Sequence, residues 1–382
     1  MFVISEIETG KTFNMGEEKN MRLLKKQFGK VIYDLTSRFV SGVSSMNSVQ
    51  AKEILEAFYE NNENTALLNY NRTITYEYDL QVIIPAYNVE DYIDECIQSV
   101  LNQKSEYSVL IVIVNDGSTD QTLSKINEYT THKNVVLIDQ ENKGFSGARN
   151  SGLKDIRAKY LMFLDSDDYL TPGSIEALLK NAYAKNADIV EGGSYFLFDK
   201  LVENVKYKEN KELDIYSIRG YPCMKVIRSE LFRNVCFPEN TWFEDSIMAF
   251  LIYPKCNKIF GIKEIVYVYR QVETSISHTY IGNPKTLDSF YITEKLINNC
   301  IESSYCMNEK MLYVFLRQVL VNQLRMESLD IKIQEAVFIR SADLINCFDF
   351  DCKSKGQYKE LYKILKKREF KKYLIWCKTH RP

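Results

Sequence analysis

Short apolar runs alternate with segments of helical spacing over residues 80–184 of this chain. The apolar runs are LQVIIPAY at 80–87, VLIVIV at 109–114, VVLI at 135–138 and YLMFLD at 160–165. The segments between and after them predict helices over 91–103, 120–131, 147–156 and 173–184. Strands that are apolar on both faces and joined by crossover helices form a parallel sheet covered by helices on both sides. We therefore expect an α/β domain.

Apolar residues at helical spacing also occur on either side of this region. They lie in 21–39 and 49–61 before it, and in 290–301, 309–328 and 334–348 after it. The sequence thus predicts a helical N-terminal extension over 1–78, an α/β domain over 79–282 and a helical C-terminal region over 283–382. The C-terminal helices are expected to pack on the α/β domain, to help shape its site or to make a homo-oligomer contact.

Polar residues follow each apolar run. In open parallel sheets, ligands bind beyond the carboxyl ends of the strands, so these residues are the candidates for a site. They are Pro85-Ala86-Tyr87-Asn88, Asn115-Asp116 with the following GSTD, Asn142-Lys143-Gly144 with Gly147-Ala148-Arg149-Asn150, and Asp165-Ser166-Asp167-Asp168. Ser118 and Asp120 are explained equally well as turn residues or helix caps.

The acidic cluster at 165–168 is not explained by turn formation alone. Its three carboxylates repel one another, and a divalent cation held together with phosphate oxygens would offset that repulsion. The cluster therefore favours a site for Mn²⁺ or Mg²⁺. The sequence contains neither a P-loop nor a G-x-G-x-x-G motif, which counts against ATPases and dinucleotide-dependent dehydrogenases.

Four motifs, VIIPAYN, VNDGSTD, NKGFSGARNSG and FLDSDD, resemble in order and spacing the signatures of the inverting family 2 glycosyltransferases. The resemblance covers about residues 80–280. It implies the GT-A fold, a Rossmann-like and mostly parallel sheet with helices on both faces. It also implies transfer of a sugar from a nucleotide-diphosphate sugar, a UDP-sugar being favoured, to a hydroxyl of a glycan or lipid-linked acceptor.

The same resemblance assigns donor-binding residues. Asp116 would receive the nucleoside base, and Asp168 would support the sugar. Asp165 would lie near the ribose, and Asp167, with Asp165, would bind the Mn²⁺ or Mg²⁺ that bridges the diphosphate. Such a metal stabilises the leaving nucleoside diphosphate without proton transfer. The other donor-binding candidates are Pro85, Tyr87, Asn88, Lys143 and Arg149.

Inversion requires a general base on the face of the sugar opposite the leaving group. The segment GYPCMKVIRSELFRNVCFPENTWFED at 220–245 looks like the family's segment that leads into its Glu-Asp motif. We therefore predict Asp245 as the base, with Glu244 as the alternative. Taken alone, the pair would be interpreted as the N-terminal cap of the apolar helix that follows.

Further residues of this region are candidates for the acceptor side. Trp242 would form a wall on which a sugar stacks, although a buried core Trp explains it equally well. Lys225 and Arg228 could reach a phosphate or the acceptor, and for Arg228 a solvated surface charge is the simpler explanation. Residues 267–278, YVYRQVETSISH, resemble the family's post-catalytic loop.

That loop contains two further candidates. Arg270 would contact the pyrophosphate, and His278 would contact it or act as a further metal ligand. A single His is explained as readily by an ordinary surface or core position.

Residues 353–382 contain eleven Lys and Arg and two acidic residues, although the whole chain is nearly neutral. Their apolar residues form a helical face of Tyr358, Leu361, Tyr362 and Leu365, which continues as Phe370, Tyr373 and Leu374. A basic helix with aromatic residues suits an anionic membrane surface. The alternative is a charged outer face over a packed core helix, and no other part of the chain supports nucleic-acid binding.

The location follows from what the sequence lacks. Its longest stretch without charged residues, 39–51, is partly polar and too short to cross a bilayer. The nine cysteines include no C-x-x-C pair, and acidic residues stand where a signal peptide would be basic. We therefore expect a cytoplasmic protein, peripheral on the inner face of the cell membrane.

These observations together predict a metal-dependent inverting glycosyltransferase of surface-polysaccharide synthesis. A catalytically silent sugar-nucleotide-binding assembly protein and a nucleotidyltransferase are the alternatives.

Overall fold

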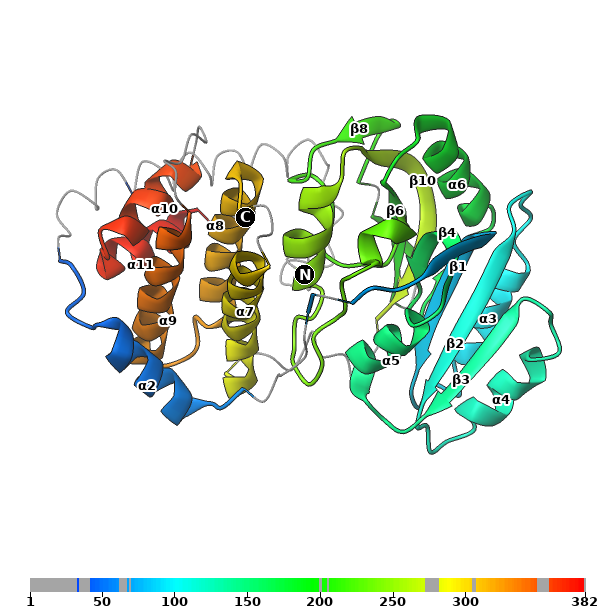
Figure 1. Ribbon diagram of the computed structural model, residues 1–382, viewed down its shortest axis with the longest axis horizontal. Coiled ribbons are helices and arrows are strands. Elements are labelled where there is room, and N and C mark those ends of the chain that lie inside the picture. The colour runs from blue at the N-terminus through cyan, green and yellow to red at the C-terminus, as the bar shows by residue number, and fades with distance from the viewer. Residues whose placement is uncertain are drawn as a thin grey trace. The chain divides into compact units, whose positions relative to one another are not determined.

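The computed structural model divides the chain into two compact units (Figure 1). One is Asn62–Glu273, and the other combines Met1–Asn61 with Thr274–Pro382. The two extensions, predicted as separate parts, thus belong to one helical unit, because α2 (Ser48–Phe58) packs against α9 (Ile331–Leu344). The residues that the structure describes are 33, 42–61, 67–68, 70–198, 201–204, 206–271, 282–303, 307–348 and 357–380.

Ten strands of the described chain form one sheet in the first unit, in the order β3-β2-β1-β4-β9-β6-β10-β5, with β7 beside β6 and β8 beside β10. The strands are β1 Ile74–Ala86, β2 Val109–Asp116, β3 Val135–Gln140, β4 Ile156–Phe163, β5 Tyr169–Leu170, β6 Ile189–Leu197, β7 Leu201–Asn204, β8 Lys211–Leu213, β9 Lys225–Arg228 and β10 Ile259–Arg270. The four predicted strands, β1 to β4, are parallel as expected. The whole sheet is mixed, because β9 runs antiparallel to both β4 and β6.

Helices cover both faces of this sheet, as predicted. They are α3 Ile93–Leu101, α4 Thr122–Tyr129, α5 Gly144–Gly152 and α6 Ser174–Lys185. Figure 1 shows α5 on the side of β1 and β2 opposite α3 and α4. The helix predicted over 147–156 is shifted, since α5 ends at Gly152 and Ile156 already pairs with β1.

The alternation of β1 explains how both faces are buried. Leu80, Val82 and Ile84 belong to the core that also contains residues of α3, α4 and α6. Ile83 points to the other face, where a Cβ on Gly152 would lie 2.5 Å from its Cγ2 atom. A side chain at Gly152 would therefore push α5 away from the sheet.

The carboxyl ends of β1 and β4 separate at the edge where the site is expected. Their pairing ends at Ile83 and Phe163, whereas β1 continues beside β2 to Ala86. The backbone of Pro85, like that of Ile83, is directed toward β4, but Pro85 lies beyond the last β1–β4 pair. A proline, which has no N–H, therefore costs the sheet no hydrogen bond at this position.

The second unit is helical. Besides α2 and α9 it contains α7 Asp288–Glu302, α8 Glu309–Arg325, α10 Gln357–Lys366 and α11 Phe370–Thr379. The helices predicted at 49–61, 290–301, 309–328 and 334–348 are confirmed by α2, α7, α8 and α9. Of the predicted segment 21–39, the structure describes only Tyr33.

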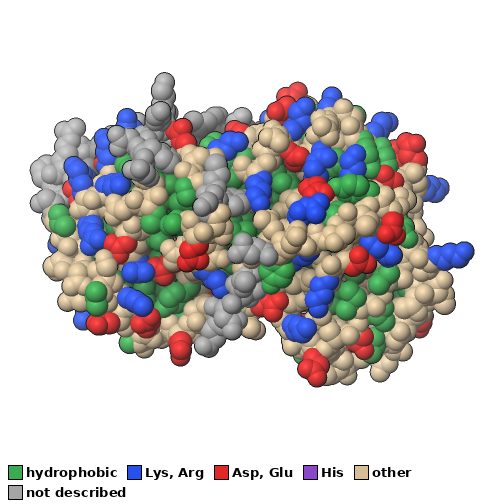
Figure 2. All heavy atoms as spheres, viewed as in Figure 1, with side chains coloured by type: hydrophobic (Ala, Val, Ile, Leu, Met, Phe, Trp, Pro, Cys, Tyr) green, Lys and Arg blue, Asp and Glu red, His purple; other side chains and the backbone are tan. Residues whose placement is uncertain are grey.

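The basic tail folds into α10 and α11, and its aromatic face is not available to a membrane. Leu361, Leu365, Tyr373 and Trp376 are all at most 1% exposed. The lysines of these helices lie on the outside, for example Lys378, and Figure 2 shows Lys and Arg side chains at the surface of this part of the molecule. The structure therefore agrees with the alternative of a charged outer face over a packed core. No helix in the described ranges is long and apolar enough to cross a membrane.

Trp376→Ala should destabilise the helical unit, because Trp376 is fully buried and its ring stacks on His380 with centroids 4.6 Å apart. We expect the free energy of unfolding to fall by about 3–5 kcal/mol. Denaturant unfolding followed by circular dichroism measures it. Lys378→Ala is the control and should change little. A Trp376→Ala protein as stable as the parent would contradict the buried position of α11.

Candidate active site

Asp116 ends β2 and holds the start of α5. Its Oδ1 accepts hydrogen bonds from Gln140 Nε2 at 2.6 Å and from the backbone N–H of Lys143 at 2.9 Å. Ser151 donates in turn to Gln140 Oε1. Gly117 follows with φ +74°. It packs so closely against Asn142 that a Cβ at position 117 would lie 2.9 Å from the backbone N of Asn142. The contacts with Gln140 and Lys143 N and the tight turn at Gly117 thus fix the position of Asp116. The Lys143 side chain is exposed.

Tyr87 and Asn88 form the turn after β1. Asn88 has a positive φ of 50°, and its Oδ1 accepts a hydrogen bond from Thr119 N at 2.8 Å. Its own N–H donates to Ser118 Oγ. Asn88 therefore joins the loops after β1 and β2, whereas Tyr87 is half exposed at the same edge. Asp120 is a turn residue just before α4, since its Oδ1 accepts from Thr122 N, whereas the N-cap of α4 is Gln121.

The three carboxylates of the acidic cluster have different surroundings. Asp168 is buried, and its two oxygens accept from the Tyr267 hydroxyl and the Arg270 backbone N–H, each at 2.7 Å. Burial, with Asp167 and Asp165 nearby, raises the pKa of Asp168 well above its usual value. Its predicted contact with the sugar is not supported, because both oxygens are used to hold the end of β10.

Asp167 is the carboxylate of the cluster that fits a cation. No other described residue makes a hydrogen bond or ion pair with its side-chain oxygens, although the charge of Arg270 acts to lower its pKa. Burial and the charge of Asp165 raise the pKa of Asp167 to about 6, so a positive ligand would relieve both effects. The described ranges contain no group of three or more His, Cys, Asp or Glu suited to a metal. The predicted ligand His278 lies outside the described residues.

Arg149 of α5 occupies the centre of the site. It is 2% exposed and contacts Asp165 Oδ1 at 3.0 Å and Glu244 Oε1 at 2.9 Å. Burial alone would lower its pKa, but these two carboxylates outweigh burial and raise it. Arg149 was predicted on the nucleotide side; the structure instead shows a buried guanidinium between carboxylates.

Arg270, at the end of β10, is held beside the acidic cluster. Its Nε donates to the Asp167 carbonyl at 2.8 Å, and Nη2 pairs with Glu95 Oε2 at 2.6 Å. The guanidinium lies over the ring of Tyr92, 4.8 Å from its centroid. Arg270 is thus placed next to Asp167, where a diphosphate contact was predicted.

The loop that carries Glu244 and Asp245 is tied to α5 by Asn150. The Asn150 amide donates to the Phe237 carbonyl and to Glu239, and its oxygen accepts from Phe237 N. Asn150 was named among the strand-end residues, directly after Arg149 in the ARN motif, but no specific role was predicted for it. Together the two residues fasten both ends of the segment 237–244.

The backbone of this loop is conformationally unusual. Asn240 and Phe243 have positive φ values of 58° and 65°, and the residues after Asp245 enter a π-helix, η3 Met248–Ile252. Positive φ in non-glycine residues and π-turns both occur preferentially at functional sites. Asp245 and Trp242 are partly exposed, and Trp242 lies edge-on to Phe243. Trp242 is therefore not the buried core residue of the alternative interpretation.

Comparison with known proteins agrees with this arrangement. Residues 81–250 match the model of glycosyl transferase family 2. They form a family 2 glycosyltransferase domain.

Two curated relatives and one solved structure illustrate the similarity. GlyA, a glycosyltransferase of Streptococcus pneumoniae, is 30% identical over 53% of this chain and 32% of its own length. The minor teichoic acid biosynthesis protein GgaB of Bacillus subtilis is 30% identical over 68% of this chain and 30% of its own. The chain thus spans about a third of the length of these relatives. S. aureus TarS 1-349, in complex with UDP-GlcNAc, superimposes with a TM-score of 0.64 over 77% of this chain and 89% of that one. At 20% identity, this shows a shared GT-A fold.

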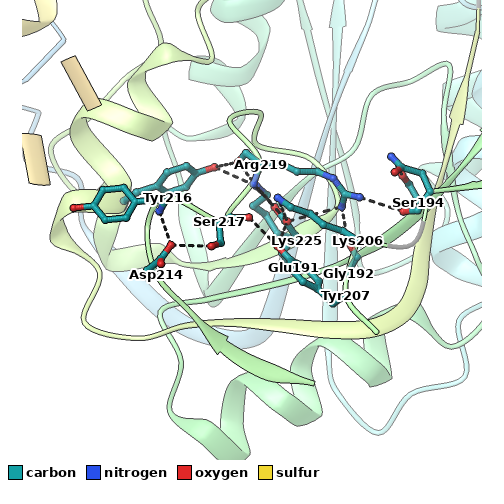
Figure 3. A network of polar contacts seen from close by, with 12 residues as sticks. Glu191, Gly192, Ser194, Lys206, Tyr207, Asp214, Tyr216, Ser217, Arg219 and Lys225 are labelled. Atoms are coloured by element: carbon teal, nitrogen blue, oxygen red, sulfur yellow. Dashed lines mark hydrogen bonds and ion pairs between the residues drawn. The ribbon is translucent and has the colours of Figure 1, made fainter. Parts of the chain in front are cut away.

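Lys225 of the glycosyltransferase domain is buried, which contradicts its predicted position on the acceptor side. Its Nζ lies 2.7 Å from Glu191 Oε2, and both side chains are fully buried. The two residues face each other across β6 and β9. Lys206 and Arg219 also approach Glu191, and Figure 3 shows the three cations around this carboxylate. Burial would raise the pKa of Glu191, but the cations lower it to about 2.

Arg228 is likewise engaged within the glycosyltransferase domain. It pairs with Asp188 through Nε at 2.8 Å. It therefore holds β9 to the start of β6.

Lys225→Met should destabilise the glycosyltransferase domain, because it removes the closest partner of a buried carboxylate. We expect the free energy of unfolding to fall by about 3 kcal/mol. Urea unfolding measures the loss, with the exposed Lys263→Met as the matched control. Adding Glu191→Gln should recover part of it, since the unpaired charge is then gone. A single variant as stable as the control would show that the pair contributes no net stability.

Proposed function

We propose that this chain transfers a sugar from a nucleotide-diphosphate sugar, with inversion, to a hydroxyl of a growing surface polysaccharide or glycolipid. The main support is that Arg149 brings two groups of carboxylates together by contacting Asp165 and Glu244. One group is Asp165 with Asp167, and the other is Glu244 with Asp245. The complex of TarS with UDP-GlcNAc supports a UDP-sugar donor. The name of GgaB, a teichoic acid biosynthesis protein, supports a cell-surface acceptor.

The residues divide into a donor side and an acceptor side. On the donor side, Asp116 and the exposed ring of Tyr87 would bind the nucleoside, and Arg270 would contact the diphosphate. Asp167 would hold Mn²⁺ or Mg²⁺, which when bound would neutralise charge on the leaving diphosphate. Asp167 is the one carboxylate of the cluster for which neither oxygen is bound by another residue in the described ranges, which supports this assignment.

On the acceptor side, Asp245 would take the proton from the attacking hydroxyl. Glu244 is the poorer candidate, because its carboxylate already binds Arg149. The partly exposed Trp242, three residues before Asp245, would contact the acceptor sugar through its ring. In this role Asp245 would act from the side opposite the bond that breaks, as inversion requires.

Attachment to an anionic membrane surface remains a prediction for residues 353–382. Because the aromatic face of α10 and α11 is buried, contact would depend on the outer Lys and Arg side chains. Such binding would be electrostatic and weakened by salt. It would bring the protein to a lipid-linked acceptor on the inner face of the membrane.

Asp245→Asn should abolish transfer while leaving nucleotide binding nearly intact. Loss of a general base lowers turnover by about 10²–10⁴-fold. Product formation from UDP-sugars, followed by mass spectrometry, measures transfer, and titration calorimetry with UDP measures binding. The exposed Asp155→Asn is the control. Full turnover with an inverted product would remove Asp245 from this role.

Asp167→Ala should remove the enhancement of UDP binding by Mn²⁺. The reason is that Asp165 is already paired with Arg149 and both oxygens of Asp168 are hydrogen-bonded, so neither replaces the Asp167 carboxylate. Calorimetric titrations with UDP in Mn²⁺ and in EDTA make the comparison. An equal enhancement by Mn²⁺ in the variant and the parent would disprove the metal assignment.

A further inference from the structure

A single buried cation joins the two sides of the proposed site. Arg149 contacts Asp165, which follows β4, through Nη2, and Glu244, 95 residues further along the chain, through Nη1. The contacting oxygens are Asp165 Oδ1, at 3.0 Å, and Glu244 Oε1, at 2.9 Å. Asp165 belongs to the donor side and Glu244 to the loop that presents Asp245. The contact is therefore a direct physical link between the two sides.

The guanidinium has no further ionic partner in the described part of the chain. Its Nε is buried without a hydrogen bond. Aromatic rings lie over the guanidinium. Its carbon, Cζ, is 3.7 Å from the ring centroid of Phe145 and 5.2 Å from that of Phe237. These rings stabilise a cation without offering an acceptor. Asp165 and Glu244 thus share one positive charge that nothing else competes for.

Sharing makes the two carboxylates dependent on each other. One positive charge between two negative ones leaves the group Asp165–Arg149–Glu244 with an excess negative charge. If Glu244 loses its charge, Arg149 is left with Asp165 alone and compensates it more fully. Because the site is largely buried, solvent screens this exchange weakly.

We propose that Arg149 is a positioning residue that couples donor binding to the acceptor-side loop. Glu244 is its second partner and an anchor for Asp245. This inference rests on the proposed function, because that function defines which side binds the donor and which the acceptor. It explains why Arg149 is buried in the site instead of exposed to the nucleotide.

The test is a binding cycle with the full chain and UDP in EDTA. Glu244→Gln keeps the hydrogen-bond acceptor and removes one negative charge, so Asp165 should repel the anionic UDP less. We expect UDP to bind about fivefold tighter. In an Arg149→Lys background, the single Nζ lacks the two fixed Nη groups through which Arg149 holds the two carboxylates. There, Glu244→Gln should change UDP affinity much less.

Two results would overturn the proposal. One is an unchanged UDP affinity in Glu244→Gln. The other is an equal gain in the Arg149→Lys background, which would show a long-range field instead of a bridge.

A second cycle tests the bridge without a nucleotide. The effects of Asp165→Asn and Glu244→Gln on thermal stability should be non-additive in the parent and additive with Arg149→Lys. Additive effects in the parent also overturn the proposal. A parent protein that binds no UDP, yet shows the non-additive pair, would count against the proposed function while supporting the bridge.

Discussion

The burial of both faces of the central strands is the constraint on which the rest of the structure depends. Strand β2 and the buried half of β1, residues 80–86, are mainly apolar on both sides, so they need helices above and below and leave polar groups mainly at their ends. This places Asp116 and Asp165 at one edge of the sheet. The close contact of Gly152 with Ile83 brings α5, and with it Arg149, to the same edge.

Two buried cations of this unit are each paired with carboxylates. Arg149 and Lys225 are both buried, and each is compensated by carboxylates from distant parts of the chain. The two pairs differ in what they can do. Lys225 with Glu191 joins neighbouring strands of the sheet, whereas Arg149 reaches Glu244 in a loop with unusual backbone angles. The first connects two strands within the fold, and the second holds the loop that we propose meets the ligands.

Local patterns predicted the parallel part of the sheet, its covering helices and the strand-end residues. The sequence also predicted α7, α8 and α9 through their apolar spacing. It could not predict which carboxylates would remain free, because this depends on partners far away in the chain. Asp168 is occupied by Tyr267, and Asp167 is not; nothing in the four letters DSDD distinguishes them. Strand β9 was missed because four residues carry too little periodicity.

The basic tail shows the same limit in another form. An amphipathic helix with aromatic residues has the same pattern whether its apolar face meets lipid or protein. Only the neighbours decide, and here Tyr373 donates a hydrogen bond to the Val319 carbonyl of α8 from a buried position. The excess positive charge therefore remains on the outer side, where it acts through its electric field. A membrane contact of this kind needs no unfolding of the helical unit.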